Sequence, residues 1–435
     1  MIFTDLVGII ADDLTGANDT ALQFHNQGAK TKILLDSSYK PDRKDLTEVW
    51  AISSESRNCN TEESLKRVSD TAKTFADNFS FEYYYKKIDS TLRGHIATET
   101  LSLIDILGYD AAIIIPAFPQ EGRITVGGYH LLKGIPIGRT EIAIDPHSPI
   151  LESHIPTLLK SQLPDGKKDL VGVLDLRTVM NGAGPILIRI NELLKEGKKL
   201  IVADSTSITD IEQIALAVKK CDKKLLPTGT AAGAQVFGKS WLADIEAEKQ
   251  TVKIPLLPKF IVSGTATQIT AEQITKLEQS DDVDNINFIP LEVRDILCGI
   301  DDEMVARIVT NLKSGITVCV HTSHLITNFD GFSDNSEMAE LTKEKFASMI
   351  TDYLAELTKE VLSEINAILI TLGGETSYKC SSKIQSKMLR LVDEVAPAIS
   401  ICSDANEQWI VTKSGNLGKS KTLIDILNYF KFHEG

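Results

Sequence analysis

Short apolar runs of strand length alternate along this chain with longer stretches in which apolar residues recur at helical spacing. In the first half, the predicted strands cover residues 6–11, 31–35, 48–53, 83–88, 111–116, 170–176 and 199–203. In the second half, they cover residues 260–262, 286–290, 316–321, 367–372 and 398–402, with a helix over residues 338–362. This alternation predicts an α/β fold, because strands joined by helices form largely parallel sheets.

Two segments interrupt the alternation and divide the chain. Residues 119–148 are rich in Gly and Pro, which predicts an inserted loop or hairpin. Residues 246–258 close with two prolines, which is typical of a crossing between domains. We therefore predict two domains, residues 1–245 and 259–435, joined by a linker over residues 246–258. Each domain is expected to be a largely parallel sheet flanked by helices, and the length of 435 residues agrees with more than one hydrophobic core.

Composition limits the partners of the chain. Asp and Glu number 60 against 46 Lys and Arg, and the formal charge of -14 repels nucleic acids and anionic membranes. The six cysteines are scattered without a C-x-x-C pair, which predicts reduced thiols. No basic leader and no apolar run of membrane-spanning length is present in the sequence. We expect a cytoplasmic protein without nucleic-acid or membrane partners, and leave a homodimer open.

Two adjacent acids follow the first predicted strand, in the segment Ala11-Asp12-Asp13-Leu14-Thr15-Gly16-Ala17. Ligands of open parallel sheets bind at the carboxyl ends of strands, so a carboxylate here can face a substrate. It would accept a proton from an attacking hydroxyl or orient Mg²⁺. The competing interpretation is that Asp13 or Thr15 caps the following helix while Asp12 is solvated.

Cationic residues follow two further strands. Arg57 comes after the third predicted strand, and Lys87 and Arg93 accompany the fourth. Guanidinium forks and an ammonium group suit the carboxylate of an acidic substrate, which an acidic protein binds only through a local cluster of cations. Ser90 and Thr91 would bond substrate hydroxyls, and Arg123 is a weaker candidate for an anion contact. For any single residue, a surface cation or a helix cap is the competing interpretation.

Three glycine turns in the second half indicate a nucleotide. Gly373-Gly374-Glu375-Thr376 and Ser263-Gly264 each follow a predicted strand, and Lys413-Ser414-Gly415-Asn416-Leu417-Gly418 supplies a third turn. Where a helix starts after such a turn, its free N–H groups and its dipole favour phosphate. The competing interpretation is that these glycines only end strands and begin helices.

A P-loop pattern also occurs, over residues 233–240. Phe237, Trp241 and Ile245 recur there at helical spacing, so we predict an apolar helix face rather than an open phosphate loop. His321 and His324 lack an acidic or Cys partner that would complete a metal site, and no metal ligands are predicted.

These blocks, in this order, resemble the four-carbon acid sugar kinase family over nearly the whole chain. The resemblance rests on residues 11–17, the run Lys87-Ile88-Asp89-Ser90-Thr91-Leu92-Arg93-Gly94, Pro116-Ala117-Phe118-Pro119 with Gly122-Arg123, and the three glycine turns. It implies an amino-terminal domain that binds the sugar acid and a carboxyl-terminal domain that binds ATP. The 87–94 run resembles the threonate and erythronate kinase branch.

The resemblance also implies roles for particular residues. The implied substrate-binding residues are Asp12, Arg57, Lys87, Ile88, Asp89 and Ser90, and Arg93 joins them from the cationic pocket. The implied ATP-binding residues are Ser263, Gly373, Gly374, Glu375, Thr376, Gly415 and Gly418. Glu375 departs from the family, which often has Asp there, and residues 229–233 only loosely match another family block.

The expected activity is therefore ATP-dependent phosphorylation of the terminal hydroxyl of D-threonate or D-erythronate, with Mg²⁺ as second cofactor. Asp12 is the first choice for proton acceptor, and Asp13 and Asp89 are the alternates. Another enzyme alternative is a kinase for 3-oxo-tetronate or another short hydroxy acid. The alternative outside enzymes is a two-domain protein that only binds an acid.

Overall fold

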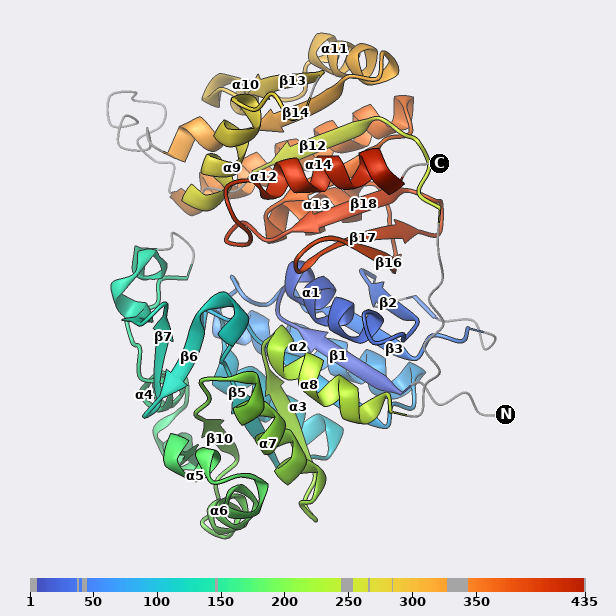
Figure 1. Ribbon diagram of the computed structural model, residues 1–435. Helices are drawn as coiled ribbons and strands as arrows, with labels where there is room; N and C mark the ends of the chain where they lie inside the picture. Colours follow the sequence, from blue (N-terminus) through green and yellow to red (C-terminus); the bar gives the residue numbers. More distant parts are fainter. Residues whose placement is uncertain are drawn as a thin grey trace. The chain divides into compact units, whose positions relative to one another are not determined.

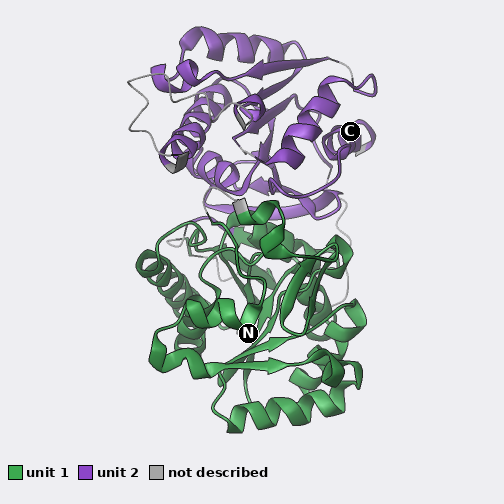
Figure 2. Ribbon diagram, turned by 90° about the vertical axis from the view of Figure 1, so that its left-hand side faces the viewer, with its two compact units in different colours: residues 1–33, 37–248 green, residues 34–36, 249–435 purple. Residues whose placement is uncertain are grey.

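The computed structural model describes residues 6–36, 39–40, 45–144, 148–243, 253–264, 267–283, 285–326 and 343–433. The chain divides into two compact units, coloured separately in Figure 2. The first holds residues 1–33 and 37–248, and the second holds residues 34–36 and 249–435. Residues 34–36 join the second unit because Leu35 N donates to Lys387 O at 2.9 Å. Residues 246–252 of the predicted linker lie outside the described residues, and that boundary stays a prediction.

The first unit is built on a parallel sheet (Figure 1). Its strands, in spatial order, are β2 (Thr31–Leu34), β3 (Val49–Ser53), β1 (Val7–Ala11), β4 (Tyr83–Lys87), β11 (Leu225–Gly229), β5 (Ala111–Ile115), β10 (Leu200–Ala203) and β9 (Val171–Leu174). The β1 side chains are buried on both faces, which explains why this strand reads as a continuous apolar run. The carboxyl ends of β1, β3 and β4 therefore meet at one edge of the sheet.

Helices cover both faces of this sheet. The group that packs together consists of α1 (Leu14–His25), α8 (Ala231–Trp241) and α7 (Ile208–Lys219). A second pair consists of α2 (Thr61–Asn78) and α3 (Ile96–Leu107). The remaining helices are α4 (Ile155–Ser161), α5 (Leu176–Met180) and α6 (Ala183–Lys195). Helix α8 contains the P-loop pattern, and its Phe237 is buried while Trp241 stacks on Tyr83 with ring centroids 4.8 Å apart. The prediction of an apolar helix is confirmed, and Ile245 lies outside the described residues.

The Gly- and Pro-rich insert forms a small antiparallel sheet after β5, as predicted for a hairpin. Its elements are a 3-10 turn (Pro119–Glu121), β6 (Arg123–Val126), β7 (Tyr129–Leu132), β8 (Ile135–Pro136) and two further 3-10 turns (Ile137–Arg139 and Glu141–Ile144). Gly127 and Gly128 make the tight turn between β6 and β7 with positive φ angles of 60° and 77°. Their N–H groups donate to the buried carboxylate of Asp204, which fixes the hairpin tip.

The second unit has a mixed sheet. Its strands, in spatial order, are β13 (Ile286–Pro290), β14 (Thr317–His321), β12 (Lys259–Ser263), β15 (Ile368–Leu372), β18 (Trp409–Lys413), β17 (Ile399–Asp404) and β16 (Met388–Ala396). The pairs from β13 to β18 are parallel, and β17 pairs antiparallel with both β18 and β16. Its helices are α9 (Gln268–Glu278), α10 (Val293–Cys298), α11 (Asp302–Lys313), α12 (Lys343–Glu364), α13 (Gly374–Lys383) and α14 (Thr422–His433).

The predicted α/β class is confirmed, and the structure corrects it in detail. Strands β11, β16 and β18 were not predicted, and the antiparallel β16–β17 pair departs from the expected parallel arrangement. The predicted strand over residues 170–176 ends at Leu174, because Asp175 accepts a hydrogen bond from Thr178 N and starts α5. In the part of the chain that the structure describes, no helix combines the length and apolar character needed to cross a membrane.

Candidate functional site

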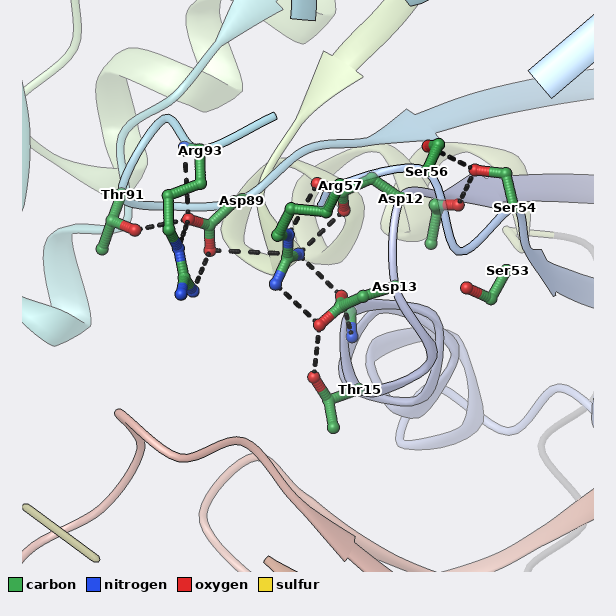
Figure 3. A network of polar contacts seen from close by, with 12 residues as sticks. Asp12, Asp13, Thr15, Ser53, Ser54, Ser56, Arg57, Asp89, Thr91 and Arg93 are labelled. Atoms are coloured by element: carbon green, nitrogen blue, oxygen red, sulfur yellow. Dashed lines mark hydrogen bonds and ion pairs between the residues drawn. The ribbon is translucent and has the colours of Figure 1, made fainter. Parts of the chain in front are cut away.

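The two acids after β1 are both buried, and they play different local roles. Asp13 caps α1, because its Oδ1 accepts from Gly16 N at 2.8 Å and its Oδ2 accepts from Thr15 Oγ1 at 2.8 Å. Asp12 is only 3% exposed, so the interpretation that it is solvated is wrong. Both side chains instead face the loop that follows β3 (Figure 3).

Arg57, from that loop, binds both carboxylates at once. Its Nε and Nη2 donate to the two oxygens of Asp12 at 2.9 Å each, and its Nη1 and Nη2 donate to those of Asp13 at 2.7 Å each (Figure 3). Burial disfavours the charged carboxylate of Asp12, yet the guanidinium charge and its hydrogen bonds hold the pKa of Asp12 below its usual range. Burial opposes the Arg57 cation too, but the carboxylates around it raise its pKa well above the usual range.

Asp89 extends the same network after β4. Arg93 Nε donates to its Oδ2 at 2.7 Å, Thr91 Oγ1 donates to the same oxygen, and Arg57 Nη2 lies 4.0 Å from Oδ1. Burial opposes its ionisation, but the charges of Arg93 and Arg57 hold the pKa of Asp89 well below its usual range. Five of the predicted residues therefore meet in one network, namely Asp12, Asp13, Arg57, Asp89 and Arg93.

The other predicted residues of this unit surround the network. Lys87 is 5% exposed, and its Nζ would lie 3.0 Å from a Cβ placed on Gly16, at the start of α1. The charge of that ammonium group is one of those that lower the pKa of Asp12. Ile88 is buried and its N–H donates to Gly229 O at 2.9 Å, so it packs rather than projects. Ser90 is half-buried, and its carbonyl oxygen lies 2.9 Å from His130 Nε2.

A buried ion pair beneath the network escaped the sequence analysis. Glu99 on α3 and Lys86 on β4 are 1% and 0% exposed, and Glu99 Oε2 lies 2.6 Å from Lys86 Nζ. Glu99 Oε1 also accepts from Ser56 Oγ at 2.6 Å, which anchors the loop that carries Arg57. The available signal was helical spacing, because Glu99 lies on the α3 face of Ile96 and Leu103.

Glu55 is the strained residue of the same loop. Its φ of 47° is in the left-handed region that non-glycine residues seldom adopt. Burial, with the nearby Asp13 charge, raises the pKa of its carboxyl from 4.5 to about 8, against the hydrogen bond from Ser53 Oγ at 2.5 Å. Glu55 is therefore largely protonated at neutral pH, beside carboxylates that are ionised.

In the second unit, β12 and β15 end side by side at closely packed turns. Ser263 is fully buried, and its Oγ has no hydrogen-bond partner among the described residues. A Cβ on Gly264 would lie 2.9 Å from both Leu354 Cδ1 and Thr376 Oγ1, so a larger residue there forces its neighbours to shift. Gly373, with φ 114°, precedes α13 and has no side chain to cap its first-turn N–H groups. An unpaired buried hydroxyl beside an uncapped helix start suits a phosphate group.

Glu375 does not face these turns freely. Its Oε1 accepts from Thr351 Oγ1 at 3.1 Å and lies 3.1 Å from Lys379 Nζ, one turn along α13. Thr376, by contrast, is buried against Gly264. The carboxylate of Glu375 is thus already held by α12 and α13 side chains.

Side chains at and before α9 donate hydrogen bonds to the carbonyl groups of the third glycine turn. Gly415 O accepts from Thr267 Oγ1 at 2.7 Å and from Thr270 Oγ1 at 2.8 Å, and Gln273 Nε2 donates to Leu417 O and Lys419 O at 3.1 Å and 2.9 Å. A trans peptide places its N–H opposite its C=O. The N–H groups of Asn416 and Gly418, which follow two of these carbonyls, are therefore directed away from α9.

Lys413, at the end of β18, was not predicted as a site residue. It is fully buried, and its Nζ donates to Ser414 O at 2.9 Å and to Thr270 Oγ1 at 3.1 Å. Burial lowers its pKa from 10.5 to about 7. Its backbone carbonyl accepts from Gly373 N at 2.8 Å, which joins the first and third turns. A lysine closing an apolar strand just before a glycine turn was the signal in the sequence.

Among the described residues, no group of three or more His, Cys, Asp or Glu side chains is arranged to hold a metal ion. His321 Nδ1 lies 2.7 Å from Ser323 Oγ, and His324 Nε2 lies 3.5 Å from Glu292 Oε1. Both histidines thus have local polar partners at the end of β14.

Two family models match the chain. Residues 7–237 match the sugar-binding N-terminal domain, and residues 260–423 match the nucleotide-binding C-terminal domain. The chain is 28% identical to a D-erythronate kinase of Heliobacterium modesticaldum, over 97% of this chain and 96% of that protein. It is 26% identical to a D-threonate kinase of Salmonella typhimurium, over 97% of this chain and 98% of that protein. It is 25% identical to a 3-oxo-tetronate kinase of Haemophilus influenzae, over 99% of each chain.

Solved structures show the same fold. A Haemophilus influenzae protein superposes with a TM-score of 0.72 at 21% identity, covering 97% of this chain and all of that one. A Salmonella typhimurium protein superposes with a TM-score of 0.75 at 19% identity, covering 96% and 98%. Because the first family model alone matches more than half of the chain and the second most of its remainder, this protein belongs to the four-carbon acid sugar kinase family.

Proposed function

We propose that this protein is an ATP-dependent kinase that phosphorylates the terminal hydroxyl of D-threonate or D-erythronate to give the 4-phosphate. The observation that carries the proposal is the carboxylate–guanidinium network at the ends of β1, β3 and β4, in a chain of this family. Kinase names among relatives that align over nearly their whole length support the reaction class. The 87–94 run favours these two acids over 3-oxo-tetronate.

The first unit would bind and orient the acid. Asp12 accepts the proton of the attacking hydroxyl in this proposal, since its lowered pKa keeps it ionised at neutral pH. Asp13 and Asp89 are its alternates. Arg57, Arg93 and the residues 87–90 would hold the substrate, with the buried ammonium group of Lys87 as a further cation.

The second unit would bind ATP. The free hydroxyl of Ser263, the first turn of α13 at Gly373, Gly374 and Thr376, and the outward N–H groups of the 415–418 turn are all suited to phosphate. Glu375 would contribute its N–H group. Mg²⁺, when bound, neutralises charge on the phosphates, and it commonly needs only one or two carboxylates because waters and phosphate oxygens complete its shell.

A panel of acids tests this function. The protein is incubated with ATP, Mg²⁺ and one of D-threonate, D-erythronate, 3-oxo-tetronate or a five-carbon sugar acid, and ADP formation is measured. We expect turnover with a four-carbon acid, and phosphorus NMR should place the new ester on the terminal carbon. Preference for 3-oxo-tetronate would support the other enzyme alternative. Acid binding without ADP formation would contradict the kinase and support a binding protein.

A further inference from the structure

Arg123 is a buried cation at the start of the hairpin insert. Its backbone is fixed, because Phe118 N donates to Arg123 O at 2.8 Å and Arg123 N donates to Phe118 O at 3.1 Å. Its side chain is 10% exposed, and its Nε is buried with no hydrogen-bond partner among the described residues. The carboxylate in ion-pair range is that of Glu121, 3.8 Å from Nη1 and itself 38% exposed.

This guanidinium is therefore poorly satisfied. Burial lowers the pKa of Arg123 from its usual value even though Asp89 and Glu121 act to raise it. A buried guanidinium without hydrogen bonds is costly, so such groups usually face an anion that binds them. Arg57 and Arg93 differ from it, because carboxylates of the chain occupy their forks.

The insert that carries Arg123 is attached to the substrate-binding segment. Burial lowers the pKa of His130 on β7 to about 4, so its ring is neutral. We assign its proton to Nε2, which then donates to Ser90 O at 2.9 Å, while Nδ1 accepts from Thr125 Oγ1 at 3.2 Å. The hairpin is thus fixed directly against the loop between Asp89 and Arg93, and Arg123 interacts electrostatically with both of these residues.

Charge balance shows what the network lacks. Its three carboxylates face two guanidinium groups and the Lys87 ammonium group, whose charge also acts on Asp12, so the network has no surplus positive charge for an anionic substrate. The Arg123 guanidinium, whose Nε has no hydrogen-bond partner among the described residues, supplies an additional positive charge beside Asp89. Its planar fork also matches a carboxylate with two parallel hydrogen bonds.

We propose that Arg123 binds the carboxylate of the sugar acid and thereby selects acids over neutral polyols. This assignment rests on the proposed function, since it names the residue of the same site that recognises the acid group. The hydroxyl end of the substrate is then left for the carboxylates near Asp12. Arg123 acts as a substrate anchor in this arrangement and takes no part in proton transfer.

The experiment compares Arg123→Gln and Arg123→Lys with the full-length wild-type enzyme. Substrates are D-threonate and D-erythronate, each paired with the matching alditol, which lacks the carboxylate. We expect Arg123→Gln to lower kcat/KM for the acid by about 100-fold, with the alditol rate and the KM for ATP unchanged. The kcat/KM of Arg123→Lys for the acid should lie between those of the wild type and Arg123→Gln, because lysine keeps the positive charge and loses the planar fork. Arg139→Gln, an exposed arginine of the same insert, is the matched control and should leave all constants unchanged.

Two further measurements separate anchoring from folding. Guanidinium ion should restore part of the acid activity of Arg123→Ala, and calorimetry should show weaker binding of D-threonate to Arg123→Gln at an unchanged Tm. An unchanged ratio of acid to alditol activity would overturn the assignment, as would loss of activity with a lowered Tm and no rescue. If the wild type binds an acid without phosphorylating it, and Arg123→Gln does not bind it, the kinase proposal fails while the anchor stands. Absence of acid binding by the wild type would overturn both.

Discussion

The candidate sites of the two units use opposite physical means. In the first unit, ionised side chains face one another: Asp12, Asp13 and Asp89 with Arg57 and Arg93. In the second unit, hydroxyls, an amide and Lys413 hold backbone carbonyls, and glycines leave space for neighbouring side chains. One site is thus arranged by charge and the other by backbone geometry.

This difference indicates how each site tolerates change. A buried charge that loses its partner is left uncompensated in a medium that solvates it poorly, so one substitution in the first unit affects folding as well as binding. A backbone cradle loses its ligand mainly when a side chain fills it or when its carbonyls are released.

Arg57→Met should have the largest effect, because it leaves Asp12 and Asp13 buried without their shared cation. We expect the free energy of unfolding to fall by about 3–5 kcal/mol, with kinase activity lost. Urea unfolding at neutral pH measures the change in the free energy of unfolding. Arg189→Met is the control, since its pairs with Glu192 and Glu196 are at the surface and should contribute under about 1 kcal/mol. Equal losses in the two variants would remove the contrast.

Gly264→Ala should weaken the binding of ATP and leave the binding of the sugar acid unchanged. The new Cβ would lie 2.9 Å from Thr376 Oγ1 and from Leu354 Cδ1, so either these side chains or the turn at Gly264 must shift. We expect the KM for ATP to rise about tenfold with little change in the KM for the acid. Gly184→Ala, in α6, has open space around the new methyl group and serves as control.

Lys239→Ala should leave ATP kinetics intact, and loss of ATP binding there would move the nucleotide to α8.

Lys413→Met should change how stability depends on pH. Between about pH 7 and pH 10.5, the unfolded chain carries a proton on this amine that the folded chain lacks, so the free energy of unfolding of the wild type rises with pH there. The substitution should remove this rise. It should also raise the KM for ATP several-fold, since Ser414 O loses its donor. Denaturant titrations at pH 7 and pH 9.5 test the slope, and Lys379→Met, at a partly exposed lysine, is the comparison.

Glu55→Gln should remove a contribution to the free energy of unfolding that depends on pH in the opposite sense to that of Lys413. Its effect should be the smallest of the four, because Glu55 is only half-buried. Between pH 4.5 and about pH 8, the folded chain holds a proton that the unfolded chain releases, so this residue makes wild-type stability fall as pH rises. The amide variant should therefore gain Tm relative to the wild type at pH 8 and differ little at pH 5. A variant that follows the wild-type profile would mean that the Glu55 carboxyl does not titrate differently in the folded chain.

The apolar runs in the sequence were sufficient to predict much of the fold. Continuous apolar runs such as residues 111–116 are buried on both faces, so their pattern survives without tertiary context. Strand β16 does not alternate strictly between buried and exposed positions over Met388–Ala396. Arg390 and Asp393 are exposed and Glu394 is half-buried, which concealed the strand among polar segments. Its antiparallel pairing with β17 depends on contacts that local sequence does not contain.

The candidate site was predicted where side chains follow strand ends. Asp12, Arg57 and Asp89 meet because parallel strands deliver their carboxyl ends to one edge. Lys86 and Glu99 could not be located in this way, because their ion pair joins the interior of a strand to a helix face. Spacing also cannot show that Arg123 lacks a partner, since that depends on which carboxylates the fold assigns to other arginines.

Helix α8 has one more consequence, for optical measurements of folding. Trp241 stacks on Tyr83 within the first unit, and Trp50 of β3 is buried in that same unit. The third tryptophan, Trp409, is 6% exposed on β18 of the second unit. Replacing Trp409 with Phe therefore leaves tryptophan fluorescence that reports the first unit alone, and multidomain chains often unfold in separate steps. The segment that imitates a nucleotide loop in sequence thus supplies a built-in fluorophore for watching one half of the molecule unfold.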